Sequence, residues 1–196
     1  MHINIILAGV GGQGILSIAA VIDHAALRSG LTIRQTEVHG MSQRGGAVQS
    51  HLRISNSEIY SDLIAEGTAH LILSVEPHEA LRYLPFLAPE GRVITAIDPF
   101  INMENYPDMD DILTELHLTN SPLLVNAAEL AREAGHTRTS NMVMLGAASP
   151  FIGIDAEHLE SAIGELFYAK GPEIVDVNIR AFRKGLELSQ TQATET

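Results

Sequence analysis

Apolar and polar positions follow two different periods in the first 37 residues. Residues 3–8 form a largely apolar run rich in β-branched side chains, which is typical of a buried strand. The run ends in glycines, and apolar side chains then recur at helical spacing, at Ile15, Ile18, Ala19, Ile22 and Ala26. Gly30 can end this helix, and residues 31–37 indicate a second strand. The pattern predicts a right-handed strand, glycine turn, helix and strand unit.

The segment after this unit departs from a regular α/β repeat. Residues 39–46 show no helical periodicity, whereas residues 48–54 alternate between apolar and polar side chains like a half-buried strand. Residues 55–58 have the composition of a turn, and residues 59–64 can return as the hairpin partner of 48–54. We therefore predict an inserted β-hairpin where a second crossover helix would be expected.

The rest of the chain returns to strand and helix signals. Strands are predicted at 69–75, 92–97 and 123–126, with a turn at 89–91 and an irregular segment at 98–106. Helices are predicted at 77–87, 110–117, 128–134, 141–149, 155–168 and 172–188. The fold class is α/β: a three-layer, Rossmann-like, mostly parallel sheet with an inserted β-hairpin and a helical C-terminal third. One domain is expected over residues 1–188, followed by a flexible polar tail at 189–196.

Composition narrows the possible functions. The chain has 196 residues, 45% of them hydrophobic, and a formal net charge of −12, which argues against a nucleic-acid or anionic-membrane surface. No apolar stretch is long enough to span a membrane. The chain has no cysteine and so cannot supply a disulfide, a thiol nucleophile or thiolate ligands for an iron–sulfur cluster. Nine histidines lie scattered without a metal-like spacing, so we expect no metal site. The lack of cysteine fits a reducing compartment, so we expect a cytoplasmic location.

The first strand and helix are joined by a Gly-x-Gly-x-x-Gly turn in the stretch LAGVGGQGIL. Its candidate ligand-binding residues are Gly9, Gly11, Gly12, Gln13 and Gly14. Backbone N–H groups and the positive end of a helix dipole favour an anion there. The alternative is that the glycines only permit close packing of helix and strand.

A dinucleotide site would also need an acidic residue at the end of the second strand. Glu37 has about the right spacing, 23 positions after Gly14. A hairpin follows this strand instead of a helix, and His39, Gln43 and Arg44 would crowd an adenosine ribose. The surroundings therefore favour another phosphate-bearing ligand over an ordinary nicotinamide or flavin.

The loop within TEVHGMSQRGGAVQSHLRI is the second candidate site. Glycines bracket Gln43 and Arg44, and Gly45 and Gly46 let the loop fold back toward the domain. The Arg44 guanidinium suits a phosphate or carboxylate, although pairing with Glu37 is the alternative. His39 and Arg44 are the candidate catalytic residues, and Glu37, Gln43, Arg44, Gly45 and Gly46 are counted with the glycine turn as candidate cofactor-binding residues.

Two later segments have both a structural and a functional interpretation. Thr139, Ser140 and Asn141 open a predicted helix, where capping is the default role, although Asn141 can also reach a site at the sheet edge. Phe182 and Gly185 on the last helix indicate packing, with a partner-subunit surface as the alternative.

The combination of GVGGQG with EVHGMSQRGG resembles the gamma-type subunits of 2-oxoacid:ferredoxin oxidoreductases. The His-Gly-Met-x-Gln-Arg-Gly-Gly form is similar to the indolepyruvate branch, where the corresponding chain is called the beta subunit. Ser42 stands where alanine is frequent. The resemblance continues through EPHEALRYLPFL, NMVMLGA and NIRAFRKG, and covers the chain except for its tail.

The resemblance implies a non-redox subunit that is inactive alone and supports thiamine-dependent oxidative decarboxylation of an arylpyruvate to an arylacetyl-CoA. It places thiamine diphosphate and iron–sulfur clusters on a large partner subunit, which passes electrons to ferredoxin, and coenzyme A near this chain in a hetero-oligomer. The alternatives are a gamma subunit acting on pyruvate, 2-oxoglutarate or 2-oxoisovalerate, a stand-alone NAD(P)-dependent dehydrogenase, or a non-catalytic binding module.

Overall fold

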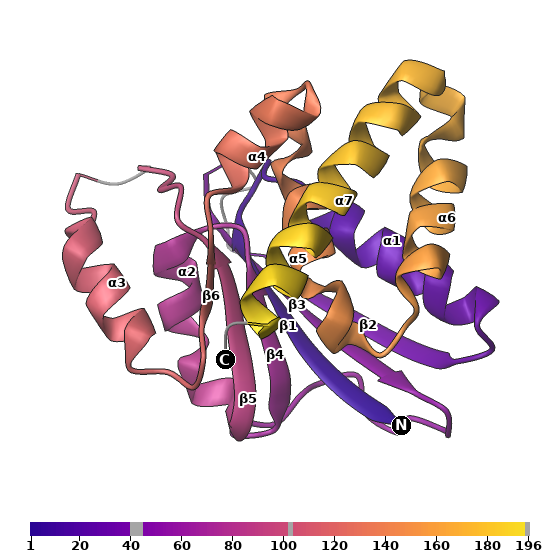
Figure 1. Cartoon of the computed structure of the whole chain (residues 1–196). Coiled ribbons are helices and arrows are strands. Elements are labelled where there is room, and N and C mark those ends of the chain that lie inside the picture. The colour runs from indigo at the N-terminus through magenta and orange to yellow at the C-terminus, as the bar shows by residue number, and fades with distance from the viewer. Residues whose placement is uncertain (40–44, 102–103, 195–196) are drawn as a thin grey trace.

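Six strands form one sheet in the order β2-β3-β1-β4-β5-β6 (Figure 1). The computed structural model describes residues 1–39, 45–101 and 104–194. The strands are β1 (His2–Val10), β2 (Thr32–His39), β3 (Ala47–Ser55), β4 (Ala69–Ser74), β5 (Leu87–Ala96) and β6 (Leu123–Val125). The β1, β4, β5 and β6 neighbours pair in parallel, whereas β3 pairs antiparallel with both β1 and β2. The expected mostly parallel sheet with an antiparallel hairpin is confirmed.

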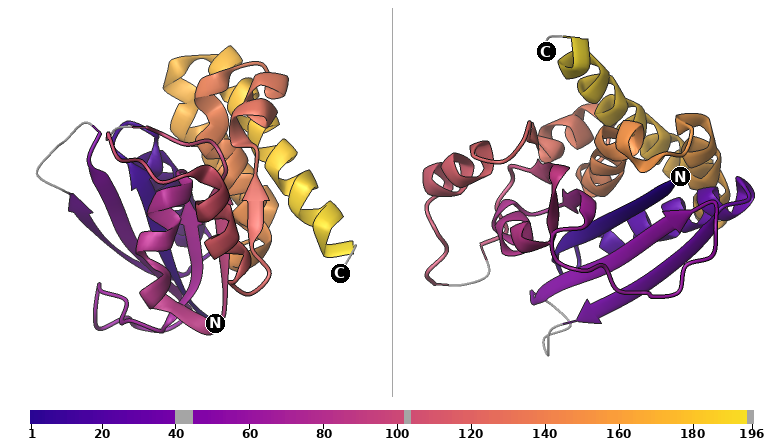
Figure 2. Two further views of the ribbon diagram at one scale, coloured as in Figure 1. Left: turned by 90° about the vertical axis from the view of Figure 1, so that its left-hand side faces the viewer. Right: turned by 90° about the horizontal axis from the view of Figure 1, so that it is seen from below.

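Helices cover the sheet on both faces (Figures 1 and 2). One layer holds α2 (Pro77–Arg82) and α3 (Met109–His117), with the short 3₁₀ turn η1 (Leu84–Phe86). The other holds α1 (Ile15–Arg28), α4 (Ala127–Ala134), α5 (Ser140–Ile152), α6 (Ala156–Phe167) and α7 (Pro172–Thr194), with the 3₁₀ turns η2 (Thr137–Thr139) and η3 (Tyr168–Lys170). The three-layer architecture and helical C-terminal third agree with the sequence analysis.

The two helix layers bury separate cores because successive strand side chains point to opposite faces. On β1, Ile5 and Leu7 join the core beneath α1 and α5, whereas Ile6 and Ala8 join the core beneath α2 and α3. This alternation within an apolar run explains why β1 has no polar face.

Helices α5 and α7 cross with their backbones in close contact. A Cβ atom on Gly146 would overlap the carbonyl of Phe182, and one on Gly185 would overlap the carbonyl of Val143. Phe182 is fully buried between the helices. The packing interpretation of Phe182 and Gly185 is confirmed, since these glycines allow the close approach.

The predicted partner of the 48–54 strand is wrong. Residues 59–64 form no strand; β3 pairs instead with β2, with Glu37 opposite Ser50. Ile59 and Ile64 are nevertheless buried, so their apolar character reflects packing and not pairing. The hairpin therefore consists of β2 and β3, and β3 separates β2 from β1.

Smaller differences concern element ends. The predicted turn at 89–91 lies within β5, where the register against β4 shifts between Ala69 and Leu71. The predicted helix at 77–87 divides into α2 and η1, because a proline at position 85 cannot continue the α-helical hydrogen bonds. The loose tail expected from 189 is also not observed over its first part, since α7 continues to Thr194 and Ser189 is buried.

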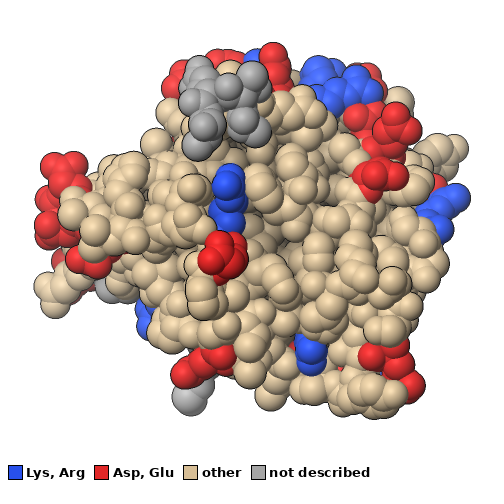
Figure 3. Space-filling model, turned by 60° about the horizontal axis from the view of Figure 1, so that its bottom comes forward, with Lys and Arg blue, Asp and Glu red and all other residues tan. Residues whose placement is uncertain are grey.

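The face drawn in Figure 3 has no single acidic patch, although the chain has a formal net charge of −12. Charged side chains of both signs lie near the rim of that face, and few lie in its middle (Figure 3). Within the described part of the chain, no helix is long and apolar enough to cross a membrane.

Candidate functional site

The glycine turn between β1 and α1 lies at the carboxyl edge of the parallel strands, where α/β folds bind ligands. Gly12 and Gly14 have φ angles of 104° and 82°, in the left-handed region that favours glycine. Gln13 braces the turn: its Oε1 accepts a hydrogen bond from the Val10 N–H at 2.7 Å, and its Nε2 donates to the Val75 carbonyl at 3.3 Å. The side chain of Gln13 thus joins the ends of β1 and β4.

Gly9 and Gly11 have structural roles in the same turn. A Cβ atom on Gly9 would overlap the Val75 side chain and come within 2.9 Å of Ile15, so Gly9 permits packing beneath the turn. The Gly11 N–H donates to the Gly46 carbonyl at 2.9 Å, which connects the glycine turn to the start of β3. For Gly9, the observed contacts therefore favour the packing interpretation.

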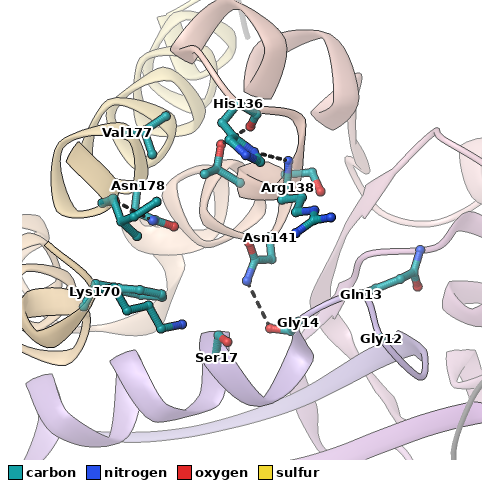
Figure 4. Close-up of a pocket in the computed structure, with 14 residues that line it drawn as sticks. Gly12, Gln13, Gly14, Ser17, His136, Arg138, Asn141, Lys170, Val177 and Asn178 are labelled. Carbon is teal, nitrogen blue, oxygen red and sulfur yellow. Dashed lines mark hydrogen bonds between the residues drawn. The ribbon is translucent and has the colours of Figure 1, made fainter.

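A cavity of about 510 Å³ opens beside the turn (Figure 4). Gly12, Gln13 and Gly14 line one side, Ser17 of α1 lies below, and the opposite walls come from η2, α5, η3 and α7. Figure 4 shows Arg138, Asn141 and Lys170 around the common space, whereas the side chain of Gln13 points away from it. The cavity therefore joins the turn to chain segments more than a hundred residues away.

The cavity is cationic although the whole chain is acidic. Arg138 and Lys170 line it, and no Asp or Glu appears among its lining residues. No ion pair with another described residue is found for either cation. Helices α1 and α5 both begin at the cavity, so two N-terminal dipole ends add to the positive potential. This arrangement is suited to an anionic ligand.

Asn141 forms the bridge between the two helix ends. Its Nδ2 donates to the Gly14 carbonyl at 3.2 Å, and the residue is buried. The residues that open α5 were expected to cap the helix with their side chains, and this is wrong for the N-cap residue, Thr139. Its hydroxyl donates to the His136 carbonyl and makes no cap hydrogen bond. Asn141 lines the cavity beside the glycine turn, and its role in ligand binding stays a prediction.

The second candidate loop lies only partly within the described residues. Gln43 and Arg44 lie outside them, as does the side chain of His39. Gly45 has a φ angle of 75°, consistent with a turn that requires glycine. The roles of these residues, including the candidate catalytic roles of His39 and Arg44, stay predictions.

Glu37 does not lie beside the glycine turn. Because β3 separates β2 from β1, Glu37 lies two strands, or about 10 Å, away from β1, at the level of Leu7 and not of the turn. Its Oε1 accepts a hydrogen bond from Gln35 Nε2 at 2.8 Å, and its carboxylate raises the pKa of Asp23 on α1. This position does not support the role of a ribose acceptor in a dinucleotide site.

Asp23 is the one described residue with a buried side-chain oxygen, Oδ1, that has no hydrogen-bond partner among the described residues. Burial, and after it the Glu37 carboxylate, raise the pKa of Asp23 from 3.8 to about 6. Among all the residues that the structure describes, no group of three or more His, Asp or Glu side chains is arranged to hold a metal ion.

Sequence patterns did not single out Arg138 or Lys170. Both occupy exposed positions in short 3₁₀ segments, which have no periodicity that would indicate a site. Each of them lies close to the start or end of a helix, but many surface cations do so, and this position alone does not indicate a binding site. Only the packing of α5 and α7 brings them to the glycine turn.

Comparisons with known proteins found a family model, relatives in sequence and solved structures with the same fold. A family model described as pyruvate ferredoxin/flavodoxin oxidoreductase matches residues 4–188. The chain is 41% identical to the indolepyruvate oxidoreductase subunit IorB of Methanothermobacter thermautotrophicus, over 94% of this chain and 96% of the relative.

Two solved structures share the fold. A keto/oxoacid ferredoxin oxidoreductase gamma subunit from Geobacter sulfurreducens has a TM-score of 0.73 at 24% identity, over 96% of this chain and 99% of that one. A 2-oxoglutarate:ferredoxin oxidoreductase from Magnetococcus marinus, with 2-oxoglutarate, coenzyme A and succinyl-CoA bound, has a TM-score of 0.77 at 23% identity. That match covers 97% of this chain but 31% of the other. The chain belongs to the pyruvate ferredoxin/flavodoxin oxidoreductase family.

Proposed function

We infer that this chain is the gamma-type subunit of an indolepyruvate:ferredoxin oxidoreductase. The observation that carries this inference is the 41% identity to an indolepyruvate oxidoreductase subunit over nearly the whole of both chains. Identity to the 2-oxoglutarate synthase subunit KorC of Methanothermobacter marburgensis is lower, at 31% over 96% of this chain. The difference supports the indolepyruvate branch over the other 2-oxoacid branches.

The work of the enzyme is divided between this chain and a large partner subunit. The partner holds thiamine diphosphate and iron–sulfur clusters, decarboxylates the arylpyruvate and transfers electrons to ferredoxin. Two observations support this division: the chain has no cysteine to ligate a cluster, and its cationic cavity is suited to a phosphate-bearing co-substrate. This chain then contributes binding and positioning to the complex.

Coenzyme A is the co-substrate that the cavity would hold. Its phosphate groups require cations and N–H donors, and Arg138, Lys170 and the N-termini of α1 and α5 supply both. Gly12 carries no side chain and has open space at its Cβ position, so an anion can approach the backbone there. When bound, coenzyme A supplies the thiol that accepts the acyl group, while the residues of this chain hold its anionic part.

The experiment is reconstitution of the chain with its large subunit. Indolepyruvate and coenzyme A together should support ferredoxin reduction by the complex, with pyruvate and 2-oxoglutarate as poorer substrates. The isolated chain should reduce neither ferredoxin nor a dye. Activity of the isolated chain, or a complex that prefers 2-oxoglutarate, would contradict the proposal.

A further inference from the structure

Two of the side chains that line the cationic cavity are buried asparagines. Asn141 at the start of α5 is 7% exposed, and Asn178 on α7 is 6% exposed. Both use the amide nitrogen within the chain: Asn141 Nδ2 donates to the Gly14 carbonyl at 3.2 Å, and Asn178 Nδ2 donates to the Ile174 carbonyl at 2.7 Å. Because a carbonyl oxygen pairs only with a donor, these contacts fix which end of each amide is the oxygen.

The two amide oxygens are acceptors that lack a donor. Neither Asn141 Oδ1 nor Asn178 Oδ1 accepts a hydrogen bond from any residue that the structure describes. Within the same residues, Asp23 Oδ1 is the one side-chain atom both unpartnered and sealed from solvent, so the two amide oxygens are open to the cavity. Figure 4 shows the amide of Asn178 on the side of α7 that faces Asn141. A ligand that displaces water from the cavity must therefore bring donors to these oxygens, because an unpartnered buried acceptor is costly.

An apolar wall lies in the same cavity. Phe167, Ile174 and Val177 contribute to its lining, and the last two precede Asn178 on α7. The Lys170 ammonium lies 4.8 Å from the centroid of the Phe167 ring, so the cation and the aromatic side chain are neighbours. The cavity therefore combines three features: cations, an apolar wall and two acceptors that need donors.

These features match a nucleotide whose base carries an exocyclic amino group. A phosphate pairs with the cations, a flat base packs on the apolar wall, and an amino group supplies two N–H donors. Asparagine is a frequent partner of adenine, whose amino group it can accept from. The cavity volume of about 510 Å³ lies within the range of about 300–1,000 Å³ that is usual for small-molecule sites.

We propose that Asn178 and Asn141 recognise the adenine of coenzyme A, with their amide oxygens accepting hydrogen bonds from its 6-amino group. The two asparagines thereby determine specificity for the base, while Arg138 and Lys170 hold phosphate groups. This inference rests on the proposed function, since it takes coenzyme A as the occupant of the cavity.

The test compares coenzyme A with the analogue in which hypoxanthine replaces adenine, by isothermal titration of the reconstituted complex. The replacement turns the 6-amino donor into a carbonyl acceptor, which would face the two amide oxygens without a hydrogen atom between them. We expect the dissociation constant to rise about 10-fold or more, as for a site whose buried polar groups lose their partners. Equal affinity for the two ligands would overturn the proposal without any substitution in the chain.

Asn178→Ala identifies the residue responsible. Alanine removes the amide and is the best helix former, so α7 should stay folded. The variant should bind coenzyme A about 5- to 10-fold more weakly, and its preference for coenzyme A over the hypoxanthine analogue should fall by a similar factor. Asn120→Ala is the matched control, because Asn120 is exposed between α3 and β6, at the opposite edge of the sheet. That variant should bind both ligands as the wild type does.

The change in preference separates recognition of the base from a structural role of Asn178. Equal losses of affinity for both ligands would place another donor of coenzyme A, such as a pantetheine amide, at these oxygens, or would show only a structural role. Either result would overturn the proposal. A preference for adenine in the wild type that Asn178→Ala reduces supports it.

The outcomes also distinguish this proposal from the proposed function. If the complex binds no coenzyme A, or if Arg138→Ala leaves its affinity unchanged, the assignment of coenzyme A to the cavity fails and recognition of the base fails with it. If Arg138→Ala weakens binding while neither the wild type nor Asn178→Ala distinguishes the two bases, only the role of the asparagines is overturned.

Discussion

The side chain of Asn141 lies directly over the Cα atom of Gly14. Its Nδ2 donates to the Gly14 carbonyl at 3.2 Å, and a Cβ atom on Gly14 would come within 2.5 Å of that nitrogen. The N-terminus of α5 is therefore fixed to the N-terminus of α1, and the cationic cavity lies where they meet. The cavity depends on this contact, which no local sequence pattern determines.

Gly14→Ala should destabilise the chain through two separate effects. The φ angle of 82° costs a non-glycine residue about 1–2 kcal/mol, and the contact with Asn141 adds to this cost. Gly30→Ala is the matched control, because Gly30 has a φ angle of 71° with no atom near its Cβ position. We expect a larger fall in the free energy of unfolding for Gly14→Ala, measured by urea denaturation. Equal losses in the two variants would show that the contact with Asn141 contributes nothing.

Arg138→Ala and Lys170→Ala should each weaken coenzyme A binding by the reconstituted complex. A charge-assisted hydrogen bond contributes roughly 1.5–3 kcal/mol, so the dissociation constant should rise about 10- to 150-fold. Arg132→Ala is the control, since Arg132 is a similarly exposed arginine that pairs with Glu129 on α4. Isothermal titration with coenzyme A would measure the effect. Unchanged affinity in both cavity variants would place the anionic part of coenzyme A elsewhere.

Asp23→Asn should stabilise the chain at neutral pH. The folded-state pKa of Asp23, about 6, lies above its ordinary value of 3.8, so folding favours the protonated form. The contribution of Asp23 to the free energy of unfolding is therefore fully present below about pH 4 and is lost as the pH rises toward 6. After allowance for partial solvent screening, the gain from Asn at pH 7 should be about 1–2 kcal/mol.

Thermal melts of Asp23→Asn and the wild type from pH 4 to pH 8 would show this gain. The two curves should converge near pH 4 and separate above it. Glu37→Gln should produce a smaller gain of the same sign, because the Glu37 carboxylate is the lesser cause of the shift. A constant difference at every pH would exclude titration of Asp23 as its origin.

Gly185→Ala should separate α5 from α7. The added Cβ atom would overlap the Val143 carbonyl, and forcing such a contact in a packed interface costs typically about 1–3 kcal/mol. Gly164→Ala provides a control of opposite sign, since Gly164 lies in α6 with open space at its Cβ position and alanine is the better helix former. Differential scanning calorimetry should show a lower Tm for the first variant and an unchanged or higher Tm for the second.

Local sequence patterns determined most of the elements of this protein. The buried run of β1, the helical spacing of α1 and the positions of α3 to α7 follow from periodicities within short segments, since each element forms its hydrogen bonds and buried face from neighbouring residues. The glycine turn was recognisable for the same reason, because its left-handed φ angles require glycine at specific positions.

Strand pairing and the composition of the cavity were decided by the tertiary fold. The alternating pattern of β3 marks a half-buried strand but does not identify its neighbour, and Ile59 and Ile64 are apolar because they are buried and not because they pair. Arg138 and Lys170 are ordinary surface cations in sequence, more than 120 residues beyond Gly14. They share a site with the glycine turn because contacts such as that between Asn141 and Gly14 join helices that are distant in the chain, and the energy of such contacts has no signature in a local window.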